Sequence, residues 1–177
     1  MNILAIDPGP VKTAWVIYDT TRKVPVQFGI EQNGTFVDDT LPPLVFKARV
    51  GSAAIEMIAS YGMAVGKEVF ETCVWIGVFL RALTMQFVPT DRVYRKDVKM
   101  HLCGSMRAKD GNIRQALIDK IGPQGTKKAP GPTYGISKDV WAALAVAVCY
   151  AETKDTPAYL SLADEANVGS TAVQEES

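Results

Sequence analysis

Residues 3–19 read ILAIDPGPVKTAWVIYD, and this stretch decides the fold. Residues 3–7 form a short apolar run rich in β-forming side chains, and the Pro-Gly-Pro that follows is typical of a turn. Residues 13–19 alternate apolar and polar side chains well enough to predict a second strand. We therefore expect an amino-terminal β-hairpin whose first strand ends at Asp7.

Beyond this hairpin the sequence predicts strands that alternate with helices. Apolar periodicity, turn residues and capping signals place the further elements at residues 26–31 (strand), 53–59 (strand), 66 to about 86 (helix), 93–94 (strand), 110–121 (helix) and 138 to about 153 (helix, capped by Ser137). Between residues 33 and 52, the paired Pro42 and Pro43 leave room for one short helix at most, between Leu44 and Val50. This order of elements predicts an α/β domain.

Length and composition are those of a globular protein. The chain has 177 residues, of which 47% are apolar and 21% charged. We expect one domain over residues 1–153 and an acidic tail over residues 154–177. The amino terminus lacks a basic leader, no apolar run reaches the ~18 residues that span a bilayer, and the three cysteines are scattered. These features predict a cytoplasmic protein without a membrane partner.

Charge is segregated along the chain, although the net charge is zero. Residues 92–128 hold ten basic and three acidic side chains, a net charge of +7, whereas residues 152–177 hold six acids and one lysine, a net charge of −5. Such asymmetry indicates a segment that binds a polyanion and a separate solvated tail. Helix surfaces that are merely rich in lysine are an equally good alternative.

Three acidic residues occupy positions in or beside apolar segments, where a carboxylate does not stabilise the fold. Asp7 ends a buried strand, Glu56 lies within an apolar run, and Asp139 opens the last helix. Burying a carboxylate is costly unless a cation compensates it, and two magnesium ions on oxygen ligands can hydrolyse a phosphodiester. Taken singly, Asp7 could start a turn, Glu56 could face solvent and Asp139 could complement the helix dipole. Together the three acids indicate a metal site.

Four segments resemble, in the same order, the RuvC family of Holliday-junction resolvases in the RNase H-like superfamily. They are IDPGPVKTAWVI (6–17), IEMIASYG (55–62), DVKMHLCGSMRAKDGNIRQALIDKIG (97–122) and DVWAALAVAV (139–148). They cover most of residues 1–153, and the compact length is most similar to that of bacteriophage resolvases. The resemblance implies an α/β fold with an RNase H-like mixed β-sheet flanked by α-helices. It also implies an endonuclease that cuts four-way DNA junctions, and leaves open whether forks and flaps are cut too.

The resemblance also implies roles for individual residues. Asp7, Glu56 and Asp139 would be the catalytic residues and would ligate two magnesium ions, with manganese as a substitute. Lys99 and Lys109 would contact DNA phosphates near the cut. If the protein is encoded by a phage, it would act in the cytoplasm of the host.

Further DNA contacts are expected from the residues around these two lysines. Arg107 and Arg114 lie in the same basic segment. Tyr61 follows the glutamate strand, where an exposed aromatic ring could wedge into unstacked bases at a junction. The alternative, that Tyr61 packs under the next helix, is about as probable from the sequence.

Members of the family act as homodimers, and the helix from Gly66 is the candidate dimer surface. Its apolar residues recur at helical spacing in a stripe that includes Phe70. Trp75, Val78 and Phe79 lie outside this stripe and are therefore expected to face a second subunit. A helix covered on both sides within one subunit is an almost equal alternative.

One departure from the family pattern keeps rival functions open. The family usually has a further acid three residues after the position of Asp139, and this chain has Ala142 there. A non-catalytic protein that binds branched DNA through a nuclease fold is therefore one rival. An actin-like ATPase is another, because its phosphate loop also reads Asp-x-Gly after a strand. That architecture needs about twice this length and a second phosphate loop, which this sequence lacks.

Overall fold

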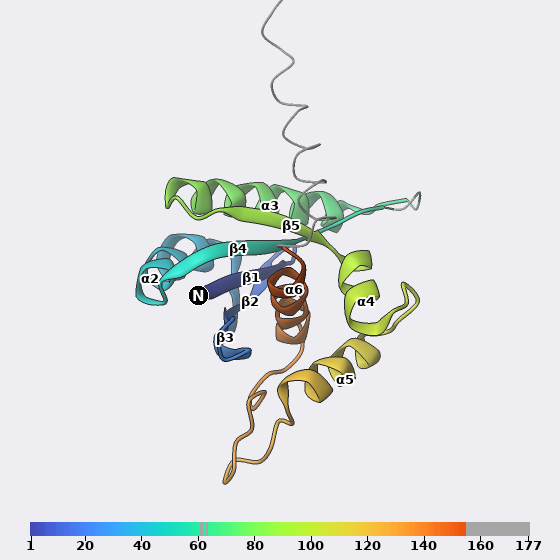
Figure 1. Ribbon diagram of the computed structural model, residues 1–177. Coiled ribbons are helices and arrows are strands. Elements are labelled where there is room, and N and C mark those ends of the chain that lie inside the picture. Colours follow the sequence, from blue (N-terminus) through green and yellow to red (C-terminus); the bar gives the residue numbers. More distant parts are fainter. Residues whose placement is uncertain (61, 63, 155–177) are drawn as a thin grey trace, which may run out of the picture.

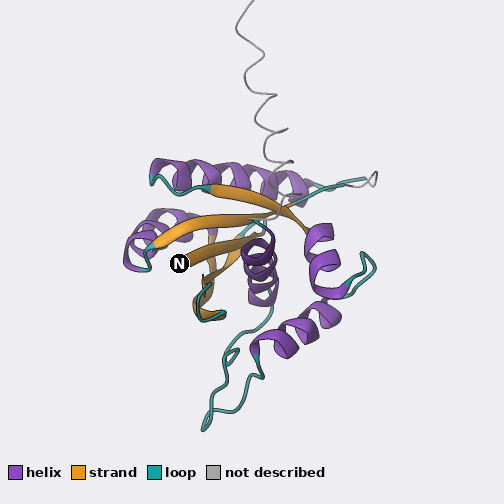
Figure 2. Ribbon diagram, in the orientation of Figure 1, coloured by secondary structure: helices purple, strands orange, loops and turns teal. Residues whose placement is uncertain are grey.

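The computed structural model describes residues 1–60, 62 and 64–154. Its elements are β1 (Asn2–Pro8), β2 (Lys12–Asp19), β3 (Val24–Gln32), α1 (Asn33–Thr35), the π-helix η1 (Phe36–Thr40), α2 (Leu41–Lys47), β4 (Val50–Met57), α3 (Lys67–Met85), β5 (Thr90–Tyr94), α4 (Arg95–Cys103), α5 (Asp110–Ile121) and α6 (Val140–Thr153). The strands form one layer with helices around it (Figures 1 and 2). None of the described helices is long and apolar enough to cross a bilayer. The predicted tail, apart from Lys154, lies outside the described residues.

The five strands form one mixed sheet in the order β3-β2-β1-β4-β5. β1 and β2 pair antiparallel as the predicted hairpin, with Asp7 opposite Ala14, and β3 continues this antiparallel half. β4 and β5 join on the other side of β1 in parallel. The predicted α/β class, with a mixed sheet and flanking helices, is confirmed.

β1 is buried on both faces, because side chains alternate across a strand. Ile3 and Ala5 belong to one apolar cluster, which α6 covers. Leu4 and Ile6 belong to a second cluster, which η1, α2 and α3 cover on the opposite face. The first strand of the chain is therefore the centre of both cores.

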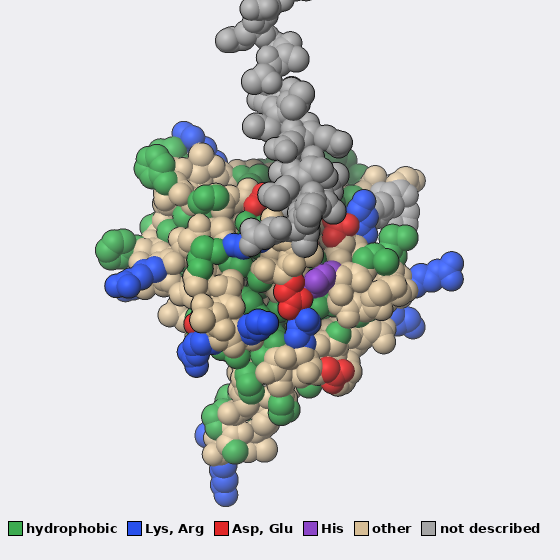
Figure 3. Space-filling model, in the orientation of Figure 1, with side chains coloured by type: hydrophobic (Ala, Val, Ile, Leu, Met, Phe, Trp, Pro, Cys, Tyr) green, Lys and Arg blue, Asp and Glu red, His purple; other side chains and the backbone are tan. Residues whose placement is uncertain are grey.

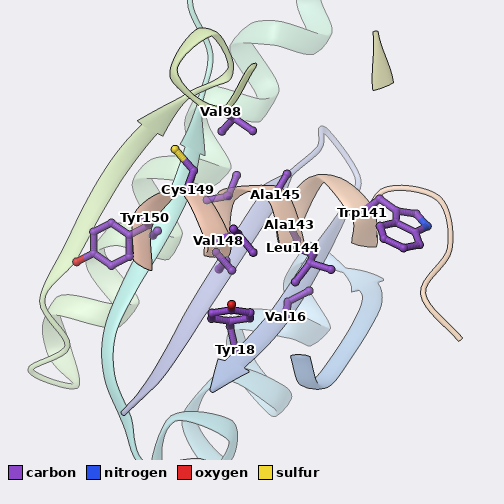
Figure 4. Packing of buried hydrophobic residues seen from close by; sticks show 14 of the residues in the cluster. Val16, Tyr18, Val98, Trp141, Ala143, Leu144, Ala145, Val148, Cys149 and Tyr150 are labelled. Carbon is purple, nitrogen blue, oxygen red and sulfur yellow. The ribbon is translucent and has the colours of Figure 1, made fainter. Parts of the chain in front are cut away.

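α6 packs directly on the sheet because its sequence is rich in small residues. From Val140 to Tyr150 every residue except Ala142 is buried. Figure 4 shows Leu144 and Val148 above Val16 and Tyr18 of β2. Alanines between the larger side chains let the helix approach the strands closely.

The start of α6 differs from the prediction that Ser137 caps a helix from residue 138. The residue that precedes the helix is Asp139, and its side chain makes no capping hydrogen bond. Ser137 contributes only its backbone carbonyl, which accepts a hydrogen bond from the Val140 amide at 3.1 Å. Lys138 has a φ of 47°, which is left-handed and cannot belong to an α-helix. The helix therefore begins two residues later than predicted.

The segment after β3 is helical over a longer stretch than the sequence predicted. α1, η1 and α2 follow one another from Asn33 to Lys47, where one short helix at most was expected. Pro42 and Pro43 lie in the first turn of α2, where a missing backbone N–H costs little. Phe36 and Leu41 are fully buried beneath the sheet and hold this segment in place. A further helix, α4, was not predicted from the sequence at all.

α3 turns a different face to the core than the one predicted. Its buried residues are Thr72, Ile76, Phe79 and Leu83. Phe79 was placed outside the buried stripe, but it is 0% exposed and its ring lies edge-on to Phe36 at 5.6 Å. Phe70 was placed within that stripe, but it is 61% exposed. The helix is amphipathic as predicted, with the phase of its apolar face rotated.

Because Phe79 is fully buried, removing its ring should leave a cavity in the core between α3 and the sheet. We expect Phe79→Ala to lower the free energy of unfolding by about 3–5 kcal/mol in urea denaturation. The matched control is Phe46→Ala, the same substitution at a position that is 84% exposed on α2. It should change stability by less than about 0.5 kcal/mol. Equal losses in the two variants would contradict the assignment of Phe79 to the core.

Candidate active site

Asp7 and Glu56 lie side by side at the carboxyl ends of two parallel strands. Ile6 of β1 is opposite Ile55 of β4, so the next residue of each strand is again a neighbour. Ala5 and Ala54 belong to the cluster beneath α6, and side chains on a strand alternate. Both carboxyl groups therefore point to the face of the sheet that α6 covers, where they share a hydrogen bond.

Asp139 brings the start of α6 to the same place. A pocket of about 530 Å³ is lined by Asp7, Glu56 and Asp139 together. Ala142, one turn into α6, also lines it. The three acids that the sequence singled out thus share one pocket, and the position of the missing fourth acid lies in its wall.

The pair of carboxyl groups perturbs the protonation of Asp7. Burial raises the pKa of the Asp7 carboxyl far above its ordinary value, and the hydrogen bond to Glu56 and the negative charge of Glu56 raise it further. The positive charge of Arg95 lowers it only in part. Without a further cation, Asp7 is therefore held neutral, and its carboxylic O–H donates a hydrogen bond to the Glu56 carboxylate.

Arg95 and Asp110 belong to the pocket, although the sequence did not single them out. Arg95 Nη1 donates to Glu56 Oε1 at 3.2 Å, and Arg95 Nη2 donates to Asp110 Oδ1 at 2.5 Å. Burial lowers the pKa of the Arg95 guanidinium, but the charges of Glu56 and Asp110 outweigh this and raise it. One signal could have found Arg95: it directly follows β5, and the carboxyl ends of neighbouring parallel strands meet at one edge of a sheet.

The donor set of the pocket fits a hard divalent cation. Carboxylate oxygens are the ligands that such ions prefer, and a cation between Asp7 and Glu56 would offset the burial and the repulsion that keep Asp7 protonated. Asp139 lies exposed at the same pocket. Among the described residues, no three His, Cys, Asp or Glu side chains already converge into a compact metal cluster. Asp139 would have to approach the other two acids on binding.

None of the predicted DNA-binding residues that the structure describes lines the pocket. Lys99 is half-buried on α4, Arg107 is exposed in the loop after it, and Lys109 is exposed directly before α5. Arg114 is occupied within the protein, as described below. Tyr61 lies outside the described residues.

Solved structures with the same architecture were found by comparison of the whole fold. The structure of Thermus thermophilus RuvC in complex with a Holliday junction substrate matches with a TM-score of 0.68 and 18% identity, over 91% of this chain and 96% of that chain. This chain has the fold of RuvC. A second Thermus thermophilus RuvC structure matches at a TM-score of 0.63 and 19% identity, over 86% of this chain and 96% of that one.

The RuvC fold is also shared with a viral protein. The fowlpox virus Holliday junction resolvase matches at a TM-score of 0.51 and 15% identity, over 86% of this chain and 99% of that chain. No protein-family model and no curated protein matches the sequence. The resemblance to RuvC that four sequence segments indicated is thus confirmed at the level of the fold.

The raised pKa of Asp7 predicts how stability depends on pH. A carboxyl group whose pKa is raised by folding stabilises the protein fully below its unfolded value of ~3.9, and this contribution is lost as pH rises through the folded pKa. Asp7→Asn keeps a hydrogen-bond donor beside Glu56 and cannot ionise. In EDTA we therefore expect the Tm of wild type to fall relative to that of Asp7→Asn as pH rises from 5 to 9. Parallel pH profiles for the two proteins would contradict a buried, protonated Asp7.

Proposed function

We propose that this protein is an endonuclease that cuts the phosphodiester bonds of branched DNA, with four-way junctions as its principal substrate. The observation that carries the proposal is the Asp7–Glu56 pair, held with Asp139 in one pocket of a RuvC fold. A buried pair of carboxyl groups is unfavourable, and a bound cation would remove this cost. The Thermus thermophilus RuvC structure that matches this chain contains a Holliday junction substrate, which suggests the class of substrate. Forks and flaps are further candidate substrates.

Asp7, Glu56 and Asp139 are proposed to hold magnesium, with manganese as a substitute. When bound, two such ions would activate a water and stabilise the leaving oxygen of the cut strand. Arg95 fixes the Glu56 carboxylate from one side, and Asp7 must give up its proton before it can act as a ligand. Ala142 supplies no ligand, so the fourth position of the pocket is left to water or to the DNA itself.

Lys99, Lys109 and Arg107 are proposed to bind phosphates of the DNA that enters the pocket. All three belong to the segment with a net charge of +7, and Lys109 directly precedes Asp110 of the pocket wall. Tyr61 stays a candidate contact at the junction. The proposed location is the cytoplasm, that of a host cell if the chain is encoded by a phage.

A non-catalytic protein that binds branched DNA is the second candidate. Ala142 favours it, as does the absence, among the described residues, of a compact cluster of three metal-ligating side chains. The two functions differ in one assay. A nuclease cuts a labelled four-way junction in magnesium, whereas the binding protein shifts its mobility and leaves it intact.

We propose that two copies of the chain associate through the outer face of α3, because a junction with two-fold symmetry is most simply cut by a two-fold protein. Phe70, Val74 and Val78 are exposed on this helix, 61%, 66% and 37% respectively, and Met85 is 59% exposed at its end. The first three are four residues apart, and Met85 follows Val78 by seven residues, which is about two helical turns. All four therefore lie in one stripe along the helix. Of the three residues expected from the sequence, this stripe includes Val78, whereas Trp75 is half-buried and Phe79 is buried.

The three acids should be needed for cleavage and dispensable for binding. We expect Asp7→Asn, Glu56→Gln and Asp139→Asn each to abolish junction cleavage in magnesium and to bind the junction at least as tightly as wild type. Each substitution keeps the shape of the side chain. Glu56→Gln and Asp139→Asn remove a negative charge that repels DNA, and Asp7→Asn removes the carboxyl group that has to ionise before it can hold magnesium. Asp39→Asn, on η1 across the sheet, is the matched control and should cut normally.

Asp139 is the decisive position in this set, because it alone is exposed and reaches the pocket from a helix. Cleavage at a near wild-type rate by Asp139→Asn, together with an inactive Asp7→Asn, would show that Asp139 is no ligand. Wild type should cut better in manganese than in magnesium, since manganese tolerates the incomplete set of ligands that Ala142 leaves.

The α3 stripe should determine the oligomeric state. We expect wild type to be a dimer at micromolar concentration and Val74→Glu to be a monomer, because a charge in an apolar interface is buried without a partner. The matched control is Val26→Glu, a substitution of another exposed valine. Val26 lies on β3, the edge strand farthest from β5, and this variant should stay dimeric. Light scattering measures both. A Val74→Glu protein that remains a dimer would place the subunit contact elsewhere.

A further inference from the structure

The segment between α5 and α6 forms a narrow β-hairpin, which we call the basic hairpin (residues 122–137). Gly125 and Pro130 form an antiparallel bridge. Nearer the tip, the amide of Thr126 donates to the carbonyl of Ala129 at 3.0 Å, and the amide of Ala129 donates back at 3.1 Å. Lys127 and Lys128 are therefore the two residues of the turn. Figure 1 shows this segment projecting away from the sheet and the helices, below α5.

Two glycines make the hairpin narrow. A Cβ atom on Gly125, which has a φ of +69°, would lie 2.3 Å from the carbonyl oxygen of Ala129. A Cβ atom on Gly131 would lie 1.9 Å from the carbonyl oxygen of Pro123. The two strands of the hairpin approach so closely that no larger residue fits at either position. The sequence thus specifies this projection in detail.

The base of the hairpin is tied to the wall of the pocket. Arg114 Nη2 donates to Gln124 Oε1 at 2.9 Å, and Gln124 Nε2 donates to the carbonyl of Ile136 at 2.9 Å. Buried Thr133 donates to the carbonyl of Gly122 at 3.0 Å. The guanidinium of Arg114 also lies over the ring of Trp141, at 5.2 Å from its centroid, and Trp141 lines the pocket. The hairpin is therefore held in a fixed relation to the site, and Arg114 acts as its anchor.

The hairpin tip carries positive charge that no acidic side chain among the described residues neutralises. Residues 121–137 contain Lys127 and Lys128 and no aspartate or glutamate. Both lysines are exposed, and within the described part of the chain neither forms an ion pair. Figure 3 shows the basic side chains at the end of this projection. Two adjacent ammonium groups repel each other unless an anion lies against them.

We propose that the basic hairpin binds the phosphate backbone of a duplex DNA arm that leaves the pocket, and so places the branch point over the acids. This inference rests on the proposed function, and it adds a second contact between the protein and DNA, outside the pocket. A protein partner fits the tip less well, because interfaces between proteins need aromatic or large apolar anchors and the one exposed aromatic residue of the hairpin, Tyr134, lies outside the turn. Lysine ammonium groups on a narrow projection suit a backbone of regularly spaced phosphates, which they contact without reading the sequence.

The test measures the affinity of a four-way junction over a range of salt concentrations. Each phosphate contact contributes about 0.9 to the slope of log K against log salt. We expect Lys127→Ala/Lys128→Ala to lower the slope by about 1.8 and to weaken binding at ~0.1 M salt by at least roughly tenfold. Lys127→Arg/Lys128→Arg should retain the wild-type slope, because it keeps both charges.

The matched control is Arg22→Ala/Lys23→Ala. It also removes two basic side chains from an exposed turn between strands, but the β2–β3 turn lies at the end of the sheet opposite Asp7. It should leave the slope and the affinity unchanged. Shortening the junction arms until they no longer reach the hairpin should remove the difference between wild type and the Lys127/Lys128 variant.

The outcomes separate this inference from the proposed function. A wild type that cuts junctions, with a hairpin variant of unchanged slope, overturns the hairpin contact and leaves the nuclease intact. A wild type that neither binds nor cuts junctions overturns the proposed function. In that case the same salt series is run with plain duplex DNA in place of the junction. A lower slope for Lys127→Ala/Lys128→Ala than for wild type would still support a phosphate contact by the hairpin. Equal slopes for the two proteins, or no binding of duplex by wild type, would overturn that contact.

Discussion

The parallel pairing of β1 with β4 is the constraint on which the rest of the structure depends. It sets Asp7 beside Glu56 in a place where neither carboxyl group can reach bulk water freely. Two features reduce the cost of burying these carboxyl groups. Asp7 stays protonated, and the guanidinium of Arg95 donates a hydrogen bond to Glu56. Arg95 is itself held by Asp110. A chain of alternating charges thus connects the sheet to α5 across the floor of the pocket.

The same pairing explains the arrangement of helices. Because β1 is central, with antiparallel partners on one side and parallel partners on the other, both of its faces must be covered. The small residues of α6 cover one face closely enough for Asp139 and Ala142 to reach the pocket. The aromatic rings of Phe36 and Phe79 fill the opposite face. Catalytic chemistry would then take place on the alanine-rich side, and subunit contact on the aromatic side.

Local patterns in the sequence were sufficient for much of this fold. The hairpin from Ile3 to Asp19, the strand around Glu56 and the bounds of α5 follow from alternation, turns and periodicity. These patterns failed where a local signal was ambiguous. Pro42 and Pro43 resemble helix breakers but lie in a first turn, and the many apolar residues of α3 fit two phases of the same helix.

In the candidate site, too, local sequence patterns predicted some residues and missed others. Asp7, Glu56 and Asp139 were recognisable because each acid stands out against apolar neighbours, and all three line the pocket. Arg95 and Asp110 were missed because both of their contacts are distant in sequence: Arg95 lies 39 residues after Glu56, and Asp110 lies 15 residues after Arg95. Asp110 has no local signal that distinguishes it from an ordinary surface charge, and Arg95 has only its position directly after β5. The anchoring role of Arg114 was hidden for the same reason, since only the tertiary fold brings it over Trp141.

The position of α6 in the chain has a consequence for biosynthesis. The first strand emerges from the ribosome with the acid that the pocket needs, whereas the helix that covers it is made more than a hundred residues later. Until then Asp139, Trp141 and Ala142 are absent, so an incomplete nascent chain lacks part of the pocket lining. A ribosome that stalls before α6 would therefore release a fragment with basic residues but without the complete set of acids. Cutting of DNA would be tied to completion of the fold.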